Sequence, residues 1–261
     1  MKKRILFLAA LLALLLSACS GSVSCPAEDP MPGERQVISR YKIMDVCEYE
    51  GNYSVLAVNW EAERSELTFV GIRDAELSGW DGAVLSAADL RPGMIVDVTW
   101  GGMVAESWPC QIHVDKVQVV KQGDDLVGLC RQVITDLWAE DSGLNGGAEI
   151  LGFDFSTLTN LADCERTALE YLVSCDVGLG LQYVTGTWEE LCEQGYIDRE
   201  NLYWENGVFL SITLEEEGSG TFRFEAEKWR SGLGAIFFTD CTAKRGCDGK
   251  WSYEIGGFAI A

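Results

Sequence analysis

The segment from Asp89 to Trp100, which reads DLRPGMIVDVTW, decides the fold of the first half of the chain. Its Arg-Pro-Gly triplet stops any preceding helix and turns the chain. The residues after the turn alternate between apolar and polar side chains, which is the period of a half-buried strand. We therefore expect Val96 and Val98 to face a core and Asp97, between them, to face water.

Four more segments around this one have the composition of strands. Each is rich in β-branched and aromatic residues and is bounded by Gly, Asn, Asp or Pro. A short helical turn precedes the quoted segment, because Ser86 and Asp89 have the spacing of a capping box. Five strands with a helix between the third and fourth have the element order of an OB-type barrel, which we predict over residues 37–122. The predicted strands are Val37–Val46, Tyr53–Trp60, Leu67–Arg73, Met94–Trp100 and Ile112–Val120.

After residue 122 the pattern becomes helical, with apolar residues at spacings of three and four up to Ala139. Two further helices are predicted, Asp163–Ser174 and Trp188–Gln194, and an Asn206-Gly207 dipeptide predicts a hairpin. The chain is thus expected to have two domains, a small OB-like β-barrel and an acidic α+β domain with an antiparallel sheet over residues 126–261. The strands predicted there are Glu149–Phe155, Asn201–Trp204, Val208–Leu214, Thr221–Trp229, Gly234–Ala243 and Lys250–Ile260.

The composition limits the partners of the chain. Its 261 residues include 20 basic and 41 acidic side chains, and 48% of the residues are apolar, which is enough for a core. An aromatic content of 10% excludes a disordered chain. Nucleic acid is excluded as a partner, because the formal charge is −21 and binding phosphates requires clustered Lys and Arg.

The first nineteen residues have the pattern of a targeting signal. A basic start is followed by twelve apolar residues, Ile5–Leu16, which are too few to span a bilayer. The closing Leu-Ser-Ala-Cys, residues 16–19, resembles the lipobox of a bacterial lipoprotein. The resemblance implies a signal peptide over residues 1–18, a lipid on Cys19 and a location outside the cytoplasm; the alternative is an ordinary secretory signal in which Cys19 has no special role.

Residues 19–36 are rich in Pro, Ser and Gly and are expected to form a tether between the lipid and the barrel. Removal of residues 1–18 takes away three basic residues and changes the charge from −21 to −24. Such a charge keeps a tethered protein soluble and repels it from anionic headgroups.

Two longer resemblances concern the mature chain. Asp89–Val98, together with Gly102–Pro109, is similar to the small OB-like domain of unknown function in secreted and lipid-anchored proteins of Gram-positive bacteria. That family usually has a small apolar residue where Cys110 stands. Phe224–Gly232 and Asp248–Trp251 resemble segments of uncharacterised secreted proteins of anaerobic gut bacteria. These resemblances imply a fold and a location but no chemistry.

Ten cysteines are present, and nine remain if Cys19 carries a lipid. Nine thiols cannot all pair within one chain, so at least one stays free or pairs with another molecule. Cys241 and Cys247 flank a predicted turn and can form a disulfide, whereas Cys164 and Cys175 lie about 16 Å apart along one helix, too far to pair. No Cys or His pairs have the spacing of a zinc site.

Catalytic and metal motifs are weak in this sequence. His113 is the single histidine, it lies within a predicted strand, and no Gly-x-Ser-x-Gly elbow accompanies it, so we expect a surface histidine rather than a catalytic base. Asp141–Gly146 is similar to the start of a calcium loop, but Gly143 and Gly152 stand where ligands are required. We expect a plain loop there, and no cofactor or metal.

Two sets of residues remain as candidates for function. Trp80 and Trp108 fall in loops of the barrel, where they can stack on a ligand or plug the open ends of the barrel. Carboxylates are the other set: Glu225 and Glu227 share one face of a strand, whereas residues 215–217 form an acidic run at a hairpin end that we expect to be solvated.

The function predicted from these observations is that of a membrane-anchored extracytoplasmic lipoprotein without enzymatic activity. Its expected partners are the membrane, through the lipid, and a peptide, a glycan or another envelope protein. The alternative is a cell-surface hydrolase that uses carboxylates of the C-terminal domain, and a third hypothesis is an envelope-stress or resistance lipoprotein without a ligand. Two carboxylates about 5 to 10 Å apart in a cleft would favour the hydrolase.

Overall fold

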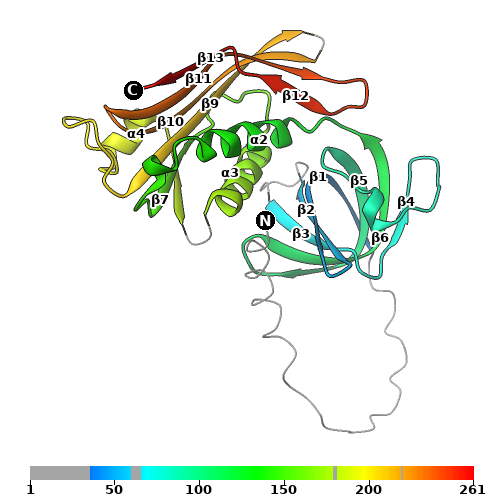
Figure 1. Cartoon of the computed structure of the whole chain (residues 1–261). Coiled ribbons are helices and arrows are strands. Elements are labelled where there is room, and N and C mark those ends of the chain that lie inside the picture. The colour runs from blue at the N-terminus through cyan, green and yellow to red at the C-terminus, as the bar shows by residue number, and fades with distance from the viewer. Residues whose placement is uncertain (1–35, 60–65, 179–180, 219) are drawn as a thin grey trace, which may run out of the picture. The chain divides into compact units, whose positions relative to one another are not determined.

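The computed structural model describes residues 36–59, 66–178, 181–218 and 220–261, which fold into two β-sheets and a few helices (Figure 1). The predicted signal peptide over residues 1–18, the predicted lipid site Cys19 and the tether up to residue 35 lie outside the described residues. Of the helices in the described ranges, none has the length and apolar character that crossing a membrane requires.

The first sheet closes into a five-stranded barrel, as predicted. Along the sheet each strand is antiparallel to its neighbour, in the order β3-β2-β1-β5-β6, and a parallel pairing of β3 with β6 closes the ring. The unpredicted strand β4 (Glu76–Ser78) pairs with β6 outside this ring. The five strands are β1 (Val37–Tyr49), β2 (Asn52–Asn59), β3 (Glu66–Gly71), β5 (Met94–Ala105) and β6 (Cys110–Gln122).

The segment quoted at the outset behaves as its alternation predicts. Val96 and Val98 are buried in the barrel core, and the carboxylate of Asp97 accepts two hydrogen bonds from Arg40, at 2.7 and 2.9 Å. The predicted helical turn is the 3-10 helix η2 (Ala87–Asp89), which begins where the Ser86 N–H donates to the Asp89 carboxylate at 2.8 Å.

The second sheet is mixed, so the prediction of an antiparallel sheet is wrong for its first strands. Strand β7 pairs in parallel with both β8 and β9, and the remaining pairings are antiparallel. The half is also mostly sheet rather than an even mixture of helix and strand. Its strands are β7 (Ile150–Asp154), β8 (Gln182–Thr185), β9 (Gly207–Gly218), β10 (Thr221–Ser231), β11 (Gly234–Arg245), β12 (Trp251–Glu254) and β13 (Gly257–Ile260).

The predicted hairpin at Asn206-Gly207 is wrong. Residues 201–202 form a turn and Tyr203 makes only isolated bridges, so no strand forms there; Gly207 begins β9, opposite Ile150 of β7. A Cβ on Gly207 would lie 1.9 Å from the indole ring of Trp204, which is itself 1% exposed. This glycine therefore makes room for a buried tryptophan rather than forming a turn.

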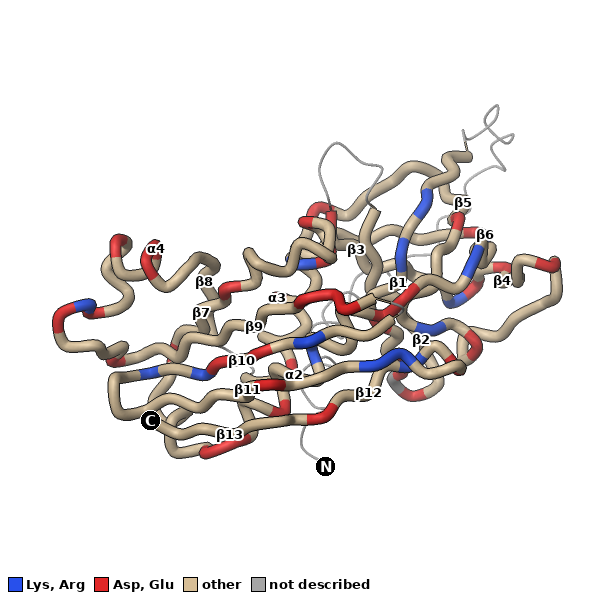
Figure 2. Tube along the Cα trace, turned by 90° about the horizontal axis from the view of Figure 1, so that it is seen from above, with Lys and Arg blue, Asp and Glu red and all other residues tan. Residues whose placement is uncertain are grey.

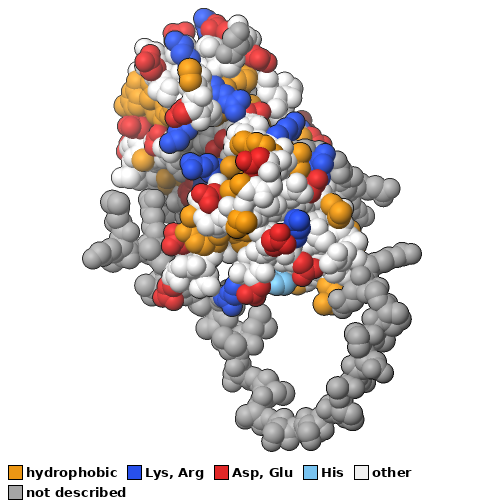
Figure 3. Space-filling view, turned by 90° about the vertical axis from the view of Figure 1, so that its right-hand side faces the viewer, with side chains coloured by type: hydrophobic (Ala, Val, Ile, Leu, Met, Phe, Trp, Pro, Cys, Tyr) orange, Lys and Arg blue, Asp and Glu red, His pale blue; other side chains and the backbone are white. Residues whose placement is uncertain are grey.

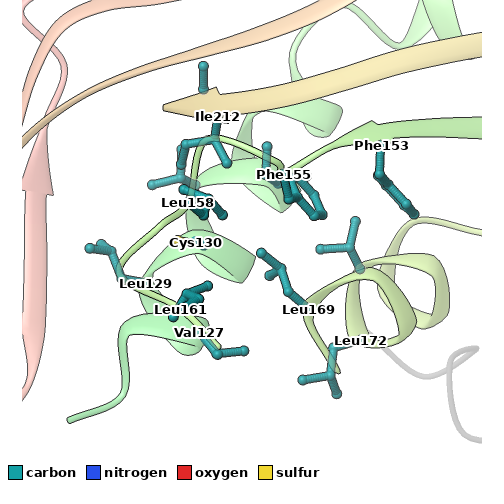
Figure 4. Close-up of a cluster of buried hydrophobic side chains, with 14 of the residues drawn as sticks. Val127, Leu129, Cys130, Phe153, Phe155, Leu158, Leu161, Leu169, Leu172 and Ile212 are labelled. Atoms are coloured by element: carbon teal, nitrogen blue, oxygen red, sulfur yellow. The ribbon is translucent and has the colours of Figure 1, made fainter. Parts of the chain in front are cut away.

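The helices cover both faces of the second sheet. Helices α2 (Leu126–Ala139) and α3 (Asp163–Val177) pack on one face, where Phe153 and Leu169 belong to one buried cluster (Figure 4). Helix α4 (Trp188–Glu193) packs on the opposite face through Leu191, against Trp204 and Trp229. The apolar stripe predicted for α2 is buried at every position: Leu126, Leu129, Val133, Ile134 and Leu137.

The barrel shares the core of α2 and α3. Along β2, Val55 and Ala57 point into the barrel, whereas Leu56 and Val58 join the cluster that the two helices form with the second sheet. Met44 of β1 joins the same cluster. The strands β1 and β2 are therefore buried on both faces, which fixes the barrel against the helices.

Two cations, Lys42 and Arg131, form ion pairs across this packing. Lys42 of β1, with its Nζ 2.6 Å from the carboxylate of Glu165 in α3, forms a pair in which both side chains are almost fully buried. Arg131 of α2 lies between two carboxylates, 3.1 Å from Asp45 of β1 and 2.6 Å from Asp176 of α3. Cations thus connect the barrel to the helices.

We predict that Lys42→Met lowers the free energy of unfolding by about 3–5 kcal/mol, because it leaves the buried Glu165 carboxylate without its cation. The double variant Lys42→Met/Glu165→Gln should recover part of this loss, since no buried charge then remains unpaired. Urea unfolding measures both values. Lys121→Met, at an exposed position of β6, is the matched control; equal losses for Lys42→Met and Lys121→Met would contradict the prediction.

Candidate functional site

The two tryptophans predicted as ligand contacts lie in different loops of the barrel. Trp80 follows β4 and Trp108 lies between β5 and β6, and their side chains are 66% and 59% exposed. Neither belongs to the cluster that fills the barrel. The structure does not bring the two into one site.

Trp108 is held in place by a residue of the second sheet. Its indole N–H donates a hydrogen bond to the hydroxyl of Tyr183 in β8. The loop is further tied by Ser107, whose hydroxyl donates to the Pro109 carbonyl at 2.7 Å and accepts from the Gln111 side chain at 3.2 Å. The exposed indole therefore lies next to Tyr183 of β8.

Glu170 of α3 lies beside Tyr183 and is half-buried. Burial raises the pKa of Glu170, while a hydrogen bond from the Thr185 hydroxyl and the nearby Arg166 oppose that rise. Burial likewise raises the pKa of Tyr183, and the hydrogen bond from Trp108 opposes it. We call Trp108, Glu170, Tyr183 and Thr185 the aromatic junction, since they gather where a barrel loop meets α3 and β8.

The aromatic junction combines the groups that recognise polar ring compounds. The indole offers an apolar surface for stacking, and the phenol, the Thr185 hydroxyl and the Glu170 carboxyl offer hydrogen bonds beside it. Tyr183 is supported from behind by Phe153, with ring centroids 5.8 Å apart. These groups can therefore stack on a ring and hydrogen-bond to its substituents.

The carboxylates predicted for the alternative hydrolase lie elsewhere. Glu225 and Glu227 of β10 share the sheet face opposite to α2 and α3, about 7 Å apart along the strand. Burial raises the pKa of Glu227, which stands between Ser211 and Phe237 of the neighbouring strands, whereas Glu225 is exposed. This pair lies on the face of a sheet and not in a cleft shown by the structure.

The remaining charged candidates are solvated. Along the chain, Asp and Glu residues are distributed over both sheets and the helices rather than gathered at one place (Figure 2). Residues 215–217 are exposed, and Glu217 pairs with Arg223 at 2.9 Å.

His113 is exposed on β6, as expected, and is the pale blue side chain of Figure 3. Asp141–Gly146 folds into a short 3-10 turn, and no three His, Cys, Asp or Glu side chains within the described ranges cluster as metal ligands.

The cysteines singled out from the sequence occupy different environments. Cys241 is buried in β11 and Cys247 is exposed beyond its end, and both are thiols in this structure, so the disulfide between them stays a prediction. Cys110, which departs from the resembled family, has its sulfur 3.1 Å from the hydroxyl of the buried Thr68. Its thiol therefore satisfies a polar group between β3 and β6.

Sequence analysis missed Glu170, Tyr183 and Thr185. Strand β8 has only four residues and no clear alternation, so Tyr183 and Thr185 had no predicted element. Glu170 is one of 41 acidic residues, and nothing in its local pattern marks it. A single signal was available, the position of Trp108 in a barrel loop.

Comparisons with known proteins add little to this geometry. No protein-family model and no curated protein sequence matches the chain. Among solved structures, an aspartyl-tRNA synthetase from Entamoeba histolytica is similar over 75% of this chain and 47% of its own, at 14% identity and a TM-score of 0.26. An asparaginyl-tRNA synthetase from Pyrococcus horikoshii is similar over 77% and 49%, at 10% identity and a TM-score of 0.24. The chain thus spans about half the length of these proteins, and likenesses this weak carry no argument about function.

We predict that Glu170→Gln removes a pH dependence of stability. The pKa of Glu170 is raised above its ordinary value of 4.5, so the folded chain still binds this proton at a pH where the unfolded chain has released it. The stability that this group contributes is therefore lost as the pH rises through the folded pKa. Glu170→Gln should therefore lose less stability than the parent between pH 4.5 and 7 in urea unfolding. Glu189→Gln, at an exposed position of α4, is the control; identical slopes for the parent and Glu170→Gln would contradict the prediction.

Proposed function

We propose that the protein is a lipoprotein anchored at Cys19 outside the cytoplasm, and that it binds a glycan of the cell envelope at the aromatic junction. The lipobox pattern of residues 16–19 supports the anchor and the location. The observation that carries the binding function is the Trp108 indole, which is exposed although its N–H is held by Tyr183.

An OB-like assignment of the barrel supports this function. The cyclic strand order β1-β2-β3-β6-β5 with a parallel β3–β6 closure, and η2 placed between β3 and β5, agrees with the OB-type order expected from the sequence. In OB folds the loop between the last two strands is one of those that bind oligosaccharides and oligonucleotides. Trp108 lies in the corresponding β5–β6 loop, and the acidity of the chain favours the oligosaccharide.

Stacking on the indole of Trp108 also favours a sugar over an extended charged molecule as the ligand. The apolar face of a pyranose packs on an indole, while its hydroxyls can accept and donate at Tyr183, Thr185 and Glu170. A raised pKa lets the Glu170 carboxyl carry a proton and donate to a sugar oxygen more readily than an exposed carboxylate.

The second candidate function is the carboxylate-dependent hydrolase. The observation in its favour is the raised pKa of Glu227 beside the exposed Glu225, a contrast that resembles the acid and base of glycosidases. If the parent protein hydrolyses a glycan and the Glu227→Gln variant does not, the protein is a hydrolase and not simply a binding protein.

We predict that Trp108→Ala weakens binding of an N-acetylglucosamine tetramer by about tenfold, because it removes the stacking surface. Isothermal titration with the purified protein measures the affinity. Trp80→Ala, which truncates an indole of similar exposure in another loop, should leave the affinity unchanged. Equal affinities for the parent and Trp108→Ala, or binding of peptides but not of sugars, would contradict a glycan site at the aromatic junction.

The anchor has its own test. We predict that cells expressing the full chain incorporate labelled palmitate into it, and that Cys19→Ala abolishes the label and releases the protein from membranes. Cys25→Ala, six residues further along the predicted tether, is the matched control and should keep the label. Label that persists in Cys19→Ala would contradict the anchor without bearing on the aromatic junction.

A further inference from the structure

We propose that Cys47 and Cys175 form a disulfide that joins the barrel to helix α3. Cys47 lies near the end of β1 and Cys175 in the last turn of α3, so the bond would connect residues that are 128 positions apart in the sequence. Cys47 is partly buried and Cys175 is exposed, and both are thiols in this structure. The inference does not depend on the lipid anchor or on the aromatic junction.

Shared neighbours bring together the chain segments that carry the two cysteines. The Cys47 sulfur lies 3.6 Å from the same Asp45 oxygen that Arg131 contacts at 3.1 Å. The other side of the Arg131 guanidinium binds Asp176, the residue that follows Cys175, at 2.6 and 2.9 Å. A single guanidinium therefore holds the end of β1 and the end of α3 together.

Tyr171 adds a second link between α3 and the barrel. Its hydroxyl donates a hydrogen bond to the Cys175 sulfur one helical turn away, and its ring packs edge-on against Phe69 of β3, with centroids 6.3 Å apart. The charge that Cys175 would carry as a thiolate raises the pKa of Cys47, and the thiolate charges of both cysteines raise the pKa of Tyr171. Tyr171 therefore connects Cys175 of α3 to strand β3 of the barrel.

The protonation of the pair favours a stable bond. Burial raises the pKa of Cys47 to about 12 and also raises the pKa of Cys175, although Arg131 acts in the opposite direction on both. Strongly oxidising disulfides are those whose reduced form is stabilised as a thiolate. Because burial outweighs the effect of Arg131 at both thiols, their thiolates are disfavoured, and we expect the bond to be less oxidising than one between stabilised thiolates.

The reaction is a thiol–disulfide exchange with a small external disulfide such as oxidised glutathione. The exposed Cys175 loses its proton and attacks the external disulfide, forming a mixed disulfide and releasing one thiol. Cys47 then loses its proton and attacks the Cys175 sulfur, which forms the internal bond and releases the second thiol. Two protein thiols are oxidised, and one external disulfide is reduced to two thiols.

Peptide mapping tests the inference on the full chain. After equilibration with oxidised glutathione and alkylation of free thiols, trypsin releases Cys47 in residues 43–64 and Cys175 in residues 167–199, a peptide that also contains Cys192. The parent and a Cys192→Ser variant are both expected to yield these two peptides joined by a disulfide. The oxidised form should also unfold at a temperature about 5–15 °C higher than the reduced form, because the bond closes a long loop.

Matched variants separate the bond from other effects of oxidation. Cys47→Ser and Cys175→Ser should each lose the linked peptides and the rise in Tm, whereas Cys110→Ser, at a partly buried cysteine of β6, should keep both. A glutathione adduct on Cys175 together with an alkylated Cys47 in the parent protein would overturn the proposal. The proposal would also be overturned if the parent protein kept both residues as free thiols, or if the linked peptides disappeared in Cys192→Ser.

Discussion

The ion pair between Lys42 and Glu165 allows strand β1 to be buried on both faces, and the rest of the structure depends on that burial. A lysine in such a strand would cost several kcal/mol if its ammonium were left without water or a partner. Glu165 supplies the partner at 2.6 Å while its other oxygen accepts from the Ala162 N–H at the start of α3. One carboxylate thus both caps the helix and neutralises the barrel strand, so α3 cannot shift without exposing a buried charge.

Cations are scarce in this acidic chain, and several of them act on its interior. Lys228 is completely buried in β10 and donates to the carbonyls of Trp138, Glu140 and Asp141, where the end of α2 leaves its carbonyls without helical partners. Arg230 donates to further loop carbonyls nearby. These cations therefore satisfy backbone carbonyls at the end of α2 and in the loops beside it.

The sequence predicted the parts of the fold that local patterns determine, and it failed where distant residues decide. Alternation in residues 94–100 predicted a barrel strand, and the 3.6-residue period predicted α2. Gly207 was misinterpreted because its partner is the ring of Trp204 and not a turn. The parallel pairing of β7 with β8 and β9 leaves no local signal, and Trp108 meets Tyr183 only after the barrel packs on α3.

That dependence connects the proposed binding site to the packing of the barrel. A tryptophan in an exposed loop binds weakly when its own rotation must be frozen by the ligand, and it binds better when the fold has already fixed it. The hydrogen bond of Trp108 is made to Tyr183 of β8, so it exists only while the barrel and the second sheet keep their places. The ion pairs of Lys42 and Arg131 keep the barrel packed against the helices, although neither side chain belongs to the aromatic junction. A bond between Cys47 and Cys175 would act at the same boundary, making permanent the arrangement in which the indole is already oriented.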